Sequence, residues 1–256
     1  MAYIQDRFIV KANSAIARDI FSMTIHCPNV AEQAQAGQFV HILPTGATLR
    51  RPISICEIDK KNGDLRIVFA VKGSGTKKIS EIKQGEYVDM LAPLGHGFTV
   101  DKQLKKVVLV GGGIGVPPML ALAHEYGKKA LAISGFRNYE AVILQKELSE
   151  MCEETVLCTD DGTVGRKCLV TEPLNELLDK GNVDGVFACG PMPMLKGIAE
   201  ICNSRGVFCE ISLEERMGCG VGACLVCACK TNKDGQEHFA HVCKNGPVFN
   251  AKEVMF

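Results

Sequence analysis

Four cysteines near the carboxyl end constrain the fold of this chain more than any other feature. Cys219, Cys224 and Cys227 lie in a glycine-rich stretch, and the fourth is Cys243. This C-x4-C-x2-C spacing with one distant cysteine is typical of a loop that binds a 2Fe-2S cluster. Glycines favour that interpretation, because a backbone without Cβ atoms can turn its N–H groups toward sulfur. The alternative is structural zinc, which the C-x2-C pair alone would suit.

The region around these cysteines is too short to fold alone. Residues 213–256 number only 44, and domains below about 70 residues usually need additional stabilisation by a disulfide or a bound metal. The metal centre would supply that stabilisation, so removal of iron is expected to disorder this region. The four cysteines named above already supply the number of ligands that a cluster requires. We therefore interpret Cys229 as a packing residue.

Composition excludes several classes of partner. The chain has 256 residues, of which 46% are hydrophobic and 23% charged, a balance typical of globular proteins. Lys plus Arg and Asp plus Glu both total 29, so no net charge favours nucleic acid or an anionic membrane. No uncharged run reaches the roughly 20 residues of a membrane-spanning helix. The 13 cysteines are an odd number and the start lacks a secretory signal pattern, so we expect a cytoplasmic protein.

Residues 1–100 carry the pattern of short strands. Residues 21–27 alternate apolar and polar side chains, residues 65–71 form another strand-like run, and an Asn-Gly pair at 62–63 marks a turn. Each such strand has one face to bury and edges to hide. The sequence therefore predicts an antiparallel barrel or sandwich.

Residues 101–212 alternate strands with helices, as in a parallel α/β unit. The expected strands are 107–110, 130–134, 155–159, 185–189 and 207–211. The expected helices are 117–126, 140–150, 172–178 and one that Pro191 and Pro193 begin. The predicted fold class is thus α+β with three domains: an antiparallel barrel at 1–100, a doubly wound parallel α/β domain at 101–212 and a small cluster-binding subdomain at 213–256.

Two motifs in the first region suit a ligand that carries phosphate. Arg-Arg-Pro-Ile-Ser at 50–54 places a cationic side chain and a hydroxyl on one stiffened strand. Lys-Gly-Ser-Gly-Thr at 72–76 leads into a predicted short helix, 76–82, that Thr76 would cap. Bare glycines before a helix form an anion site. A surface ion pair is the alternative interpretation of Arg51.

The second region contains a glycine turn and a cysteine at strand ends. The strand 107–110 runs into a turn and a helix, an order that lets a pyrophosphate approach the backbone; the glycines concerned are Gly111, Gly112, Gly113 and Gly115. The spacing departs from the dinucleotide fingerprint and no acidic residue ends the strand 130–134, so the choice between NAD and NADP stays open. Cys189 ends a parallel strand, where ligands of open α/β sheets bind. A small buried thiol is the alternative.

The motifs of the first region together resemble the flavin domain of the ferredoxin reductase superfamily. This resemblance implies FAD as a cofactor, with Arg51 on its pyrophosphate and Ser54 near its reactive nitrogen. It also implies that Pro52, Ile53, Val68, Phe69 and Ala70 lie along the flavin and that Gly75 and Thr76 bind phosphate. Ile53 stands where the superfamily often has an aromatic residue, which removes the basis for ring stacking there. In the superfamily a Cys-Gly-x-x segment faces the nicotinamide, which gives Cys189 a role in hydride transfer.

The order of barrel, nucleotide domain and cysteine loop is similar to that of the electron-transfer subunits of type B, NAD-dependent dihydroorotate dehydrogenases. The similarity implies that a separate FMN-containing subunit oxidises dihydroorotate and that electrons cross a 2Fe-2S cluster on the four cysteines. A hydride then goes from FAD to NAD. It also implies a heterotetramer with two copies of each subunit.

Two other hypotheses stay open. The chain could be a stand-alone NAD(P)H reductase of ferredoxin or flavodoxin, or a zinc-stapled flavin-binding module without a relay. Glu214 and Glu215 adjoin the cysteine loop and are either solvated charges or part of a docking face. None of the six histidines lies in a recognisable nucleophile or metal constellation.

Overall fold

The first half of the protein is a closed barrel. The computed structural model describes residues 3–256, and its first six strands close in the order β1-β2-β5-β4-β3-β6. All neighbours are antiparallel, which confirms the predicted barrel. The strands are β1 (Ile4–Ala17), β2 (Ile20–His26), β3 (Phe39–Leu43), β4 (Arg51–Asp59), β5 (Asp64–Ala70) and β6 (Tyr87–Leu94), with short helices α1 (Pro28–Gln33) and α2 (Ser74–Ser80) between them.

Alternation along these strands separates the barrel interior from its outer surface. In β3, for example, Val40 and Ile42 point inward and join the barrel core, because side chains two residues apart share a face. Phe39 points outward, yet it is buried in the hydrophobic cluster of the second half of the molecule. The outer face of β3 is therefore an internal surface of the protein.

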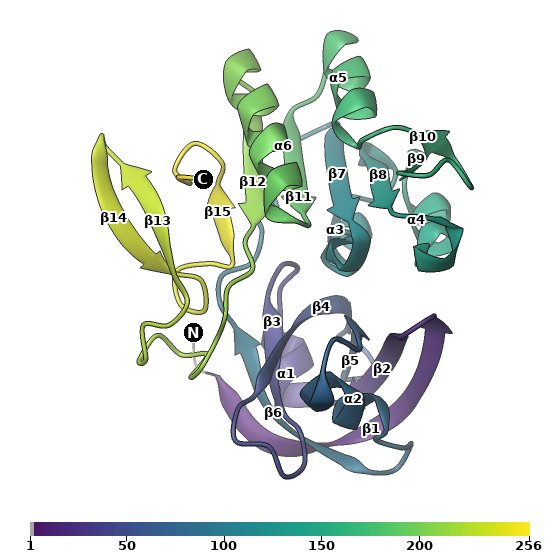
Figure 1. Ribbon diagram of the computed structural model, residues 1–256, viewed down its shortest axis with the longest axis vertical. Coiled ribbons are helices and arrows are strands. Elements are labelled where there is room, and N and C mark those ends of the chain that lie inside the picture. The colour runs from purple at the N-terminus through teal and green to yellow at the C-terminus, as the bar shows by residue number, and fades with distance from the viewer. Residues whose placement is uncertain (1–2) are drawn as a thin grey trace.

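The second half is a parallel sheet with helices on both faces (Figure 1). Its strand order is β10-β9-β8-β7-β11-β12-β15, and all neighbours except β12 and β15 are parallel. The strands are β7 (Val107–Gly112), β8 (Ala130–Phe136), β9 (Glu154–Thr159), β10 (Arg166–Lys167), β11 (Gly185–Cys189), β12 (Phe208–Ser212) and β15 (Val248–Asn250). The helices are α3 (Val116–Tyr126), α4 (Gln145–Met151), α5 (Thr171–Asp179) and α6 (Met192–Arg205), with 3-10 turns η1 (Gly113–Gly115), η2 (Gly127–Lys129) and η3 (Tyr139–Ala141).

Each face of the sheet has its own core. Val107 and Leu109 of β7 pack with α3 and α4, whereas Val108 and Val110 pack with α5 and α6. Helix α3 also touches the barrel, since Cys56 of β4 belongs to the same buried cluster. This contact fixes the barrel against the sheet and holds the space between them.

One predicted helix is shorter than expected. The stretch 140–150 contains the 3-10 turn η3 and then α4, which begins only at Gln145. Leu144 between them has a φ of +58°, a left-handed conformation that cannot continue an α-helix. The side chain of Asn138 accepts a hydrogen bond from the backbone N–H of Ala141, which closes the 3-10 turn instead.

The last residues return to the main sheet. A hairpin of β13 (Ala228–Lys233) and β14 (Gln236–His241) follows the cysteine loop, and β15 then pairs with β12. Phe249 and Ala251 are buried in the core on one face of the sheet. Within residues 3–256, no helix combines the length and the apolar character needed to cross a membrane.

Candidate functional site

A cleft opens where the barrel meets the parallel sheet. It encloses about 850 Å³, including the space at its open mouth. Its barrel wall contains most of the residues predicted for the flavin: Pro52, Ile53, Ser54, Val68, Phe69, Ala70 and Thr76. Two motifs that are separate in the sequence thus form one wall of a single cleft.

Two adjacent arginines, Arg50 just before β4 and Arg51 at its first residue, have different roles. Arg50 forms a 2.7 Å ion pair with Asp89 on β6 and is largely buried, so it holds the barrel together. Arg51 extends toward the start of α2, where a Cβ at Gly75 would overlap its guanidinium group. Arg51 and Gly75 are therefore adjacent, as a shared phosphate site requires, and Gly75 has no side chain because the arginine occupies that space.

Thr76 stabilises the turn before α2 in a different way from the predicted cap. The N-cap of α2 is Gly73, and Thr76 is the third residue of the helix. Its hydroxyl accepts hydrogen bonds from the backbone N–H groups of Lys72 (2.9 Å) and Gly73 (3.2 Å). The prediction that Thr76 begins the helix was therefore wrong by two residues, because its side chain bonds backward to the turn instead of forward to the helix.

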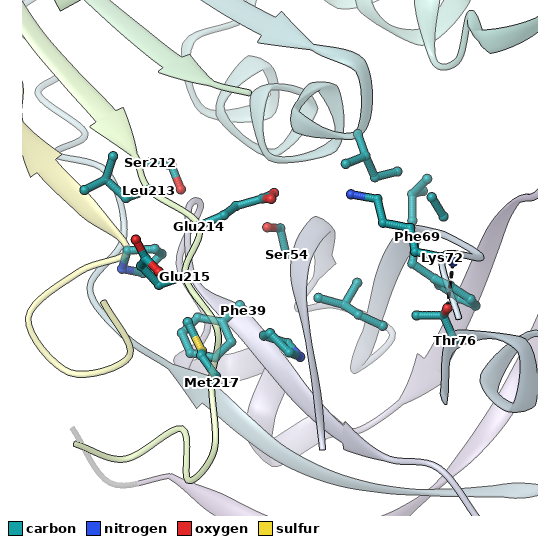
Figure 2. Close-up of a pocket in the computed structure, with 16 residues that line it drawn as sticks. Phe39, Ser54, Phe69, Lys72, Thr76, Ser212, Leu213, Glu214, Glu215 and Met217 are labelled. Atoms are coloured by element: carbon teal, nitrogen blue, oxygen red, sulfur yellow. Dashed lines mark hydrogen bonds between the residues drawn. The ribbon is translucent and has the colours of Figure 1, made fainter. Parts of the chain in front are cut away.

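The opposite wall of the cleft comes from the end of β12 and the segment that follows it. Ser212, Leu213, Glu214, Glu215 and Met217 line it. Figure 2 shows Glu214 and Ser54 directed into the cleft from its two walls, and Phe39 beside Met217. No sequence motif predicts this wall. The available signal was the position of the segment at the carboxyl end of a parallel strand, where ligands usually bind.

The glycine turn and Cys189 meet at the point where the strand order reverses. Strand β7 has β8 on one side and β11 on the other, and ligands of open α/β sheets bind at such a switch point. A Cβ at Gly115 would overlap the carbonyl oxygen of Cys189, and a Cβ at Gly112 would lie 2.6 Å from Met194 Sδ. Gly113, with a φ of +53°, faces open space. Gly111 pairs with Cys189 across the sheet.

Cys189 is a neutral thiol. It is 1% exposed, and burial together with the negative charge of Glu214 raises its pKa to about 12. In the parallel pairing of β11 with β12, Cys189 lies opposite Ser212, which lines the cleft. Such a thiol supplies a fixed, uncharged surface beside the cleft and is no proton acceptor near neutral pH.

The four cysteines predicted as ligands lie together as two pairs. Cys227 Sγ and Cys243 Sγ are 3.2 Å apart, and the backbone N–H of Cys219 donates to Cys224 Sγ at 3.4 Å. Two irons that each take two thiolates need this arrangement. The donor set therefore fits a two-iron cluster.

The loop offers backbone N–H groups to the thiols. Cys219 Sγ accepts from Val221 (3.4 Å), Ala223 (3.2 Å) and Cys224 (3.4 Å). Although burial raises the pKa of Cys219, these donors outweigh it and lower the pKa to about 6. The thiolate form, which binds metal, is thus favoured at this position. Cys229 lies outside the set and packs against the hydrophobic core.

Known proteins with the same organisation have an established name. Residues 214–255 match the model of the iron-sulfur cluster binding domain of dihydroorotate dehydrogenase B. A protein of Caldanaerobacter subterraneus subsp. tengcongensis is 40% identical over 96% of this chain and 97% of its own length, and one of Geobacillus thermodenitrificans is 40% identical over 98% of both. Both are named dihydroorotate dehydrogenase B (NAD(+)), electron transfer subunit. The chain belongs to this family.

As an electron transfer subunit of dihydroorotate dehydrogenase B, the chain is part of an oxidoreductase. Its fold also resembles the solved structure of an NADH-dependent reduced ferredoxin-NADP oxidoreductase, with a TM-score of 0.85 and 29% identity over 97% of this chain and 89% of that one. The ferredoxin reductase of carbazole 1,9a-dioxygenase shares the fold at a TM-score of 0.70 and 18% identity, over 81% of this chain and 67% of that one.

Proposed function

We propose that this chain carries electrons between a separate dihydroorotate-oxidising subunit and NAD, through a 2Fe-2S cluster and FAD. One observation supports the proposal most strongly: the segment after β12 lines the cleft from Ser212 to Met217 and reaches the first cluster cysteine, Cys219, two residues later. Only Gly218 lies between the last cleft residue, Met217, and the first cluster cysteine. An electron relay needs its centres close together.

In this proposal, residues 1–100 hold the flavin. Arg51, Gly75 and Thr76 bind the pyrophosphate at the start of α2, and the side chains along β4 and β5 form the surface beneath the ring. Ser54 lies near the reactive edge. Bound FAD would exchange a hydride with nicotinamide and single electrons with the cluster. The protein orients the ring, keeps water from the buried wall and leaves the mouth of the cleft open to the nucleotide.

Residues 101–212 take the dinucleotide. Gly111, Gly112, Gly113 and Gly115 let its pyrophosphate approach the backbone at the start of α3. The end of β11 at the buried Cys189 lies beside the nicotinamide. We propose NAD as the coenzyme because the names of the relatives specify it. Residues 213–256 hold the cluster through Cys219, Cys224, Cys227 and Cys243.

The partner in this proposal is an FMN-containing catalytic subunit, in a cytoplasmic heterotetramer with two copies of each chain. The name of the relatives as electron transfer subunits supports a separate catalytic chain. Cys224, Leu225 and Val226 are exposed on the cysteine loop, and Leu225 is 59% exposed. Exposed apolar side chains next to a ligand are suited to contact with that partner.

The test uses the purified chain alone under anaerobic conditions. NADH should reduce its flavin, and dihydroorotate should not do so until the partner subunit is added. Iron analysis should give two irons per chain, and the reduced protein should give the electron paramagnetic resonance spectrum of a 2Fe-2S cluster. Bleaching of the isolated chain by dihydroorotate would overturn the division of roles. Zinc in place of iron would remove the relay.

A further inference from the structure

Two cysteines outside the cluster loop lie in contact at one edge of the parallel sheet. Cys158 belongs to β9, and Cys168 directly follows β10, the strand at that edge (Figure 1). The Cys168 thiol donates a hydrogen bond to Cys158 Sγ, and the two sulfur atoms are 3.3 Å apart. The S–S bond of a disulfide is about 2.05 Å long, so the sulfurs need to approach by only about 1.3 Å to form one.

The backbone holds these two thiols near each other. In the parallel pairing of β10 with β9, Arg166 lies opposite Cys158 and Lys167 lies opposite Thr159. The chain turns at once after this pairing, because the backbone N–H of Cys168 donates to the carbonyl oxygen of Arg166 at 3.1 Å. Closure of a disulfide therefore requires a small local adjustment at the edge strand and no rearrangement of the sheet.

The two thiols differ in their exposure. Cys158 is 1% exposed, and burial raises the pKa of its thiol to about 12, so it is protonated near neutral pH. Cys168 is partly exposed, so a small oxidant can reach it from solvent. The guanidinium group of Arg166, which pairs with Glu176, is close enough for its positive charge to act on both thiols. Partial exposure beside a positive charge is typical of cysteines that react with oxidants.

We propose that Cys158 and Cys168 are a reversible oxidation site: hydrogen peroxide converts the pair to a disulfide, and a small dithiol restores both thiols. Cys168 is the residue that the peroxide attacks first, and Cys158 is the buried partner that completes the disulfide. Disulfides in reducing compartments are usually transient and redox-sensing, which suits a pair that is reduced at rest. The inference does not depend on the flavin or the cluster, so its failure leaves the proposed function untouched.

The chemistry takes two steps. Cys168 loses its proton to solvent, and its thiolate sulfur bonds to one oxygen of the peroxide; the O–O bond breaks, hydroxide leaves, and the product is a sulfenic acid. Cys158 then attacks that sulfur, so the S–S bond forms, the S–O bond breaks and a second hydroxide leaves. The two thiol protons convert both hydroxides to water. Two electrons thus pass from the thiols to the peroxide, and thiol–disulfide exchange with a dithiol returns them.

A second thiol pair in the same domain provides an internal comparison. Cys202 of α6 and Cys209 of β12 also share a hydrogen bond between their side chains. They are 0% and 2% exposed, so neither thiol is open to solvent. Contact between thiols is therefore common to both pairs, and access for the oxidant distinguishes them. The structure predicts that Cys158 and Cys168 react and that Cys202 and Cys209 do not.

The experiment treats the purified holoprotein with an equimolar amount of hydrogen peroxide, alkylates the remaining thiols and digests the protein with trypsin. Trypsin cuts after Arg166 and Lys167, so a disulfide joins peptide 147–166 to peptide 168–180. Fragmentation in the mass spectrometer then separates Cys158 from Cys152 within the first peptide. The linked peptides should appear in wild type and disappear after dithiothreitol. A link between peptides 197–205 and 206–216, which carry the comparison pair, should be absent.

Three variants test the order of the steps. Cys168→Ser should form no link and should leave Cys158 unoxidised. Cys158→Ser should stop at a sulfenic acid on Cys168, which the trapping reagent dimedone labels. Cys202→Ser is the matched control and should give as much of the 147–166 and 168–180 link as wild type.

The wild-type protein alone decides the inference, whether or not a variant folds. Absence of the link with Cys168 still free for alkylation would overturn it. A sulfenic acid on Cys168 without a disulfide would also overturn it, because the pair would then not act together. Equal linkage of Cys202 and Cys209 would show that exposure does not govern the reaction, which contradicts the argument. A link that forms with peroxide and reopens with dithiothreitol supports it.

Discussion

The contact between Gly115 and Cys189 gives the sharpest test of the nucleotide site. A Cβ at Gly115 would overlap the carbonyl oxygen of Cys189 and lie 2.5 Å from its carbonyl carbon and 2.7 Å from the backbone nitrogen of Gly190. Carbon atoms in contact prefer about 3.5–4.0 Å. Since all three neighbours are backbone atoms, no side chain can rotate away. In Gly115→Ala the glycine turn and the end of β11 must separate by about 1 Å.

The magnitude follows from that displacement. Overpacking of a tight contact costs about 1–3 kcal/mol of stability. Gly115 has φ −82° and ψ −5°, a conformation with negative φ that is open to alanine, so no left-handed backbone strain adds to the cost. A 1 Å misplacement of reacting groups can slow a reaction by about a hundredfold. Gly115→Ala should therefore reduce the rate of flavin reduction by NADH by about that factor, measured by stopped-flow absorbance of the flavin.

Gly206→Ala is the matched control for stability. Gly206 ends α6 with a φ of +68°, and nothing lies within 4 Å of a Cβ placed there. The left-handed conformation costs alanine about 1–2 kcal/mol, similar to the expected loss at Gly115. This control should unfold at a lower urea concentration yet react with NADH at the wild-type rate. The reasoning fails if Gly115→Ala keeps the wild-type rate of flavin reduction, or if Gly206→Ala loses as much.

Three further predictions concern other parts of the site and the fold. Arg51→Gln should weaken FAD binding by about ten- to hundredfold, because a hydrogen bond to a charged group contributes about 1.5–3 kcal/mol; Arg18→Gln, at an exposed arginine 3.8 Å from Glu140, should bind FAD normally in the same flavin-release titration. Cys224→Ser should lose iron, counted by elemental analysis, while NADH still reduces its flavin; full iron in this variant would contradict the ligand set. Asp184 accepts from the backbone N–H groups of Lys106 and Lys105, which lower its pKa. The ionised Asp184 carboxylate therefore stabilises the folded protein fully above its ordinary pKa of 3.8, and this stabilisation is lost as pH falls through the lower pKa of the folded state. In that acid range, the urea midpoint of Asp184→Asn should decline less steeply than the urea midpoint of the wild type.

The architecture was predictable because it depends on short-range patterns. Period-two alternation marks the barrel strands, and the turn after residue 110 separates a buried strand from a helix in the order that parallel sheets require. Strand β11 was predicted with the bounds that the structure has, Gly185–Cys189. Its five residues are all buried, so the apolar run and the strand coincide.

Local competition between side chain and backbone was less predictable. Threonine is a residue type that often caps helices, but the Thr76 hydroxyl accepts hydrogen bonds from the backbone N–H groups of Lys72 and Gly73. Leu144 interrupts a stretch with good helical composition by adopting a left-handed backbone. In both places the start of the helix depends on local contacts between a few residues. Amino-acid composition does not encode the geometry of those contacts.

The assembly of the site could not be read from the sequence, because its walls come from distant segments. Residues 50–76 predict a flavin surface and residues 219–243 predict a cluster, but nothing in either pattern places His41 against Gly220. That contact exists because the segment after β12 leaves the sheet and runs down beside the barrel (Figure 1), where it covers the outer face of β3. The same segment lines the cleft before it reaches the ligands. A displacement of this one segment would therefore alter the cleft and the cluster position together, which ties the geometry of hydride exchange to that of single-electron transfer.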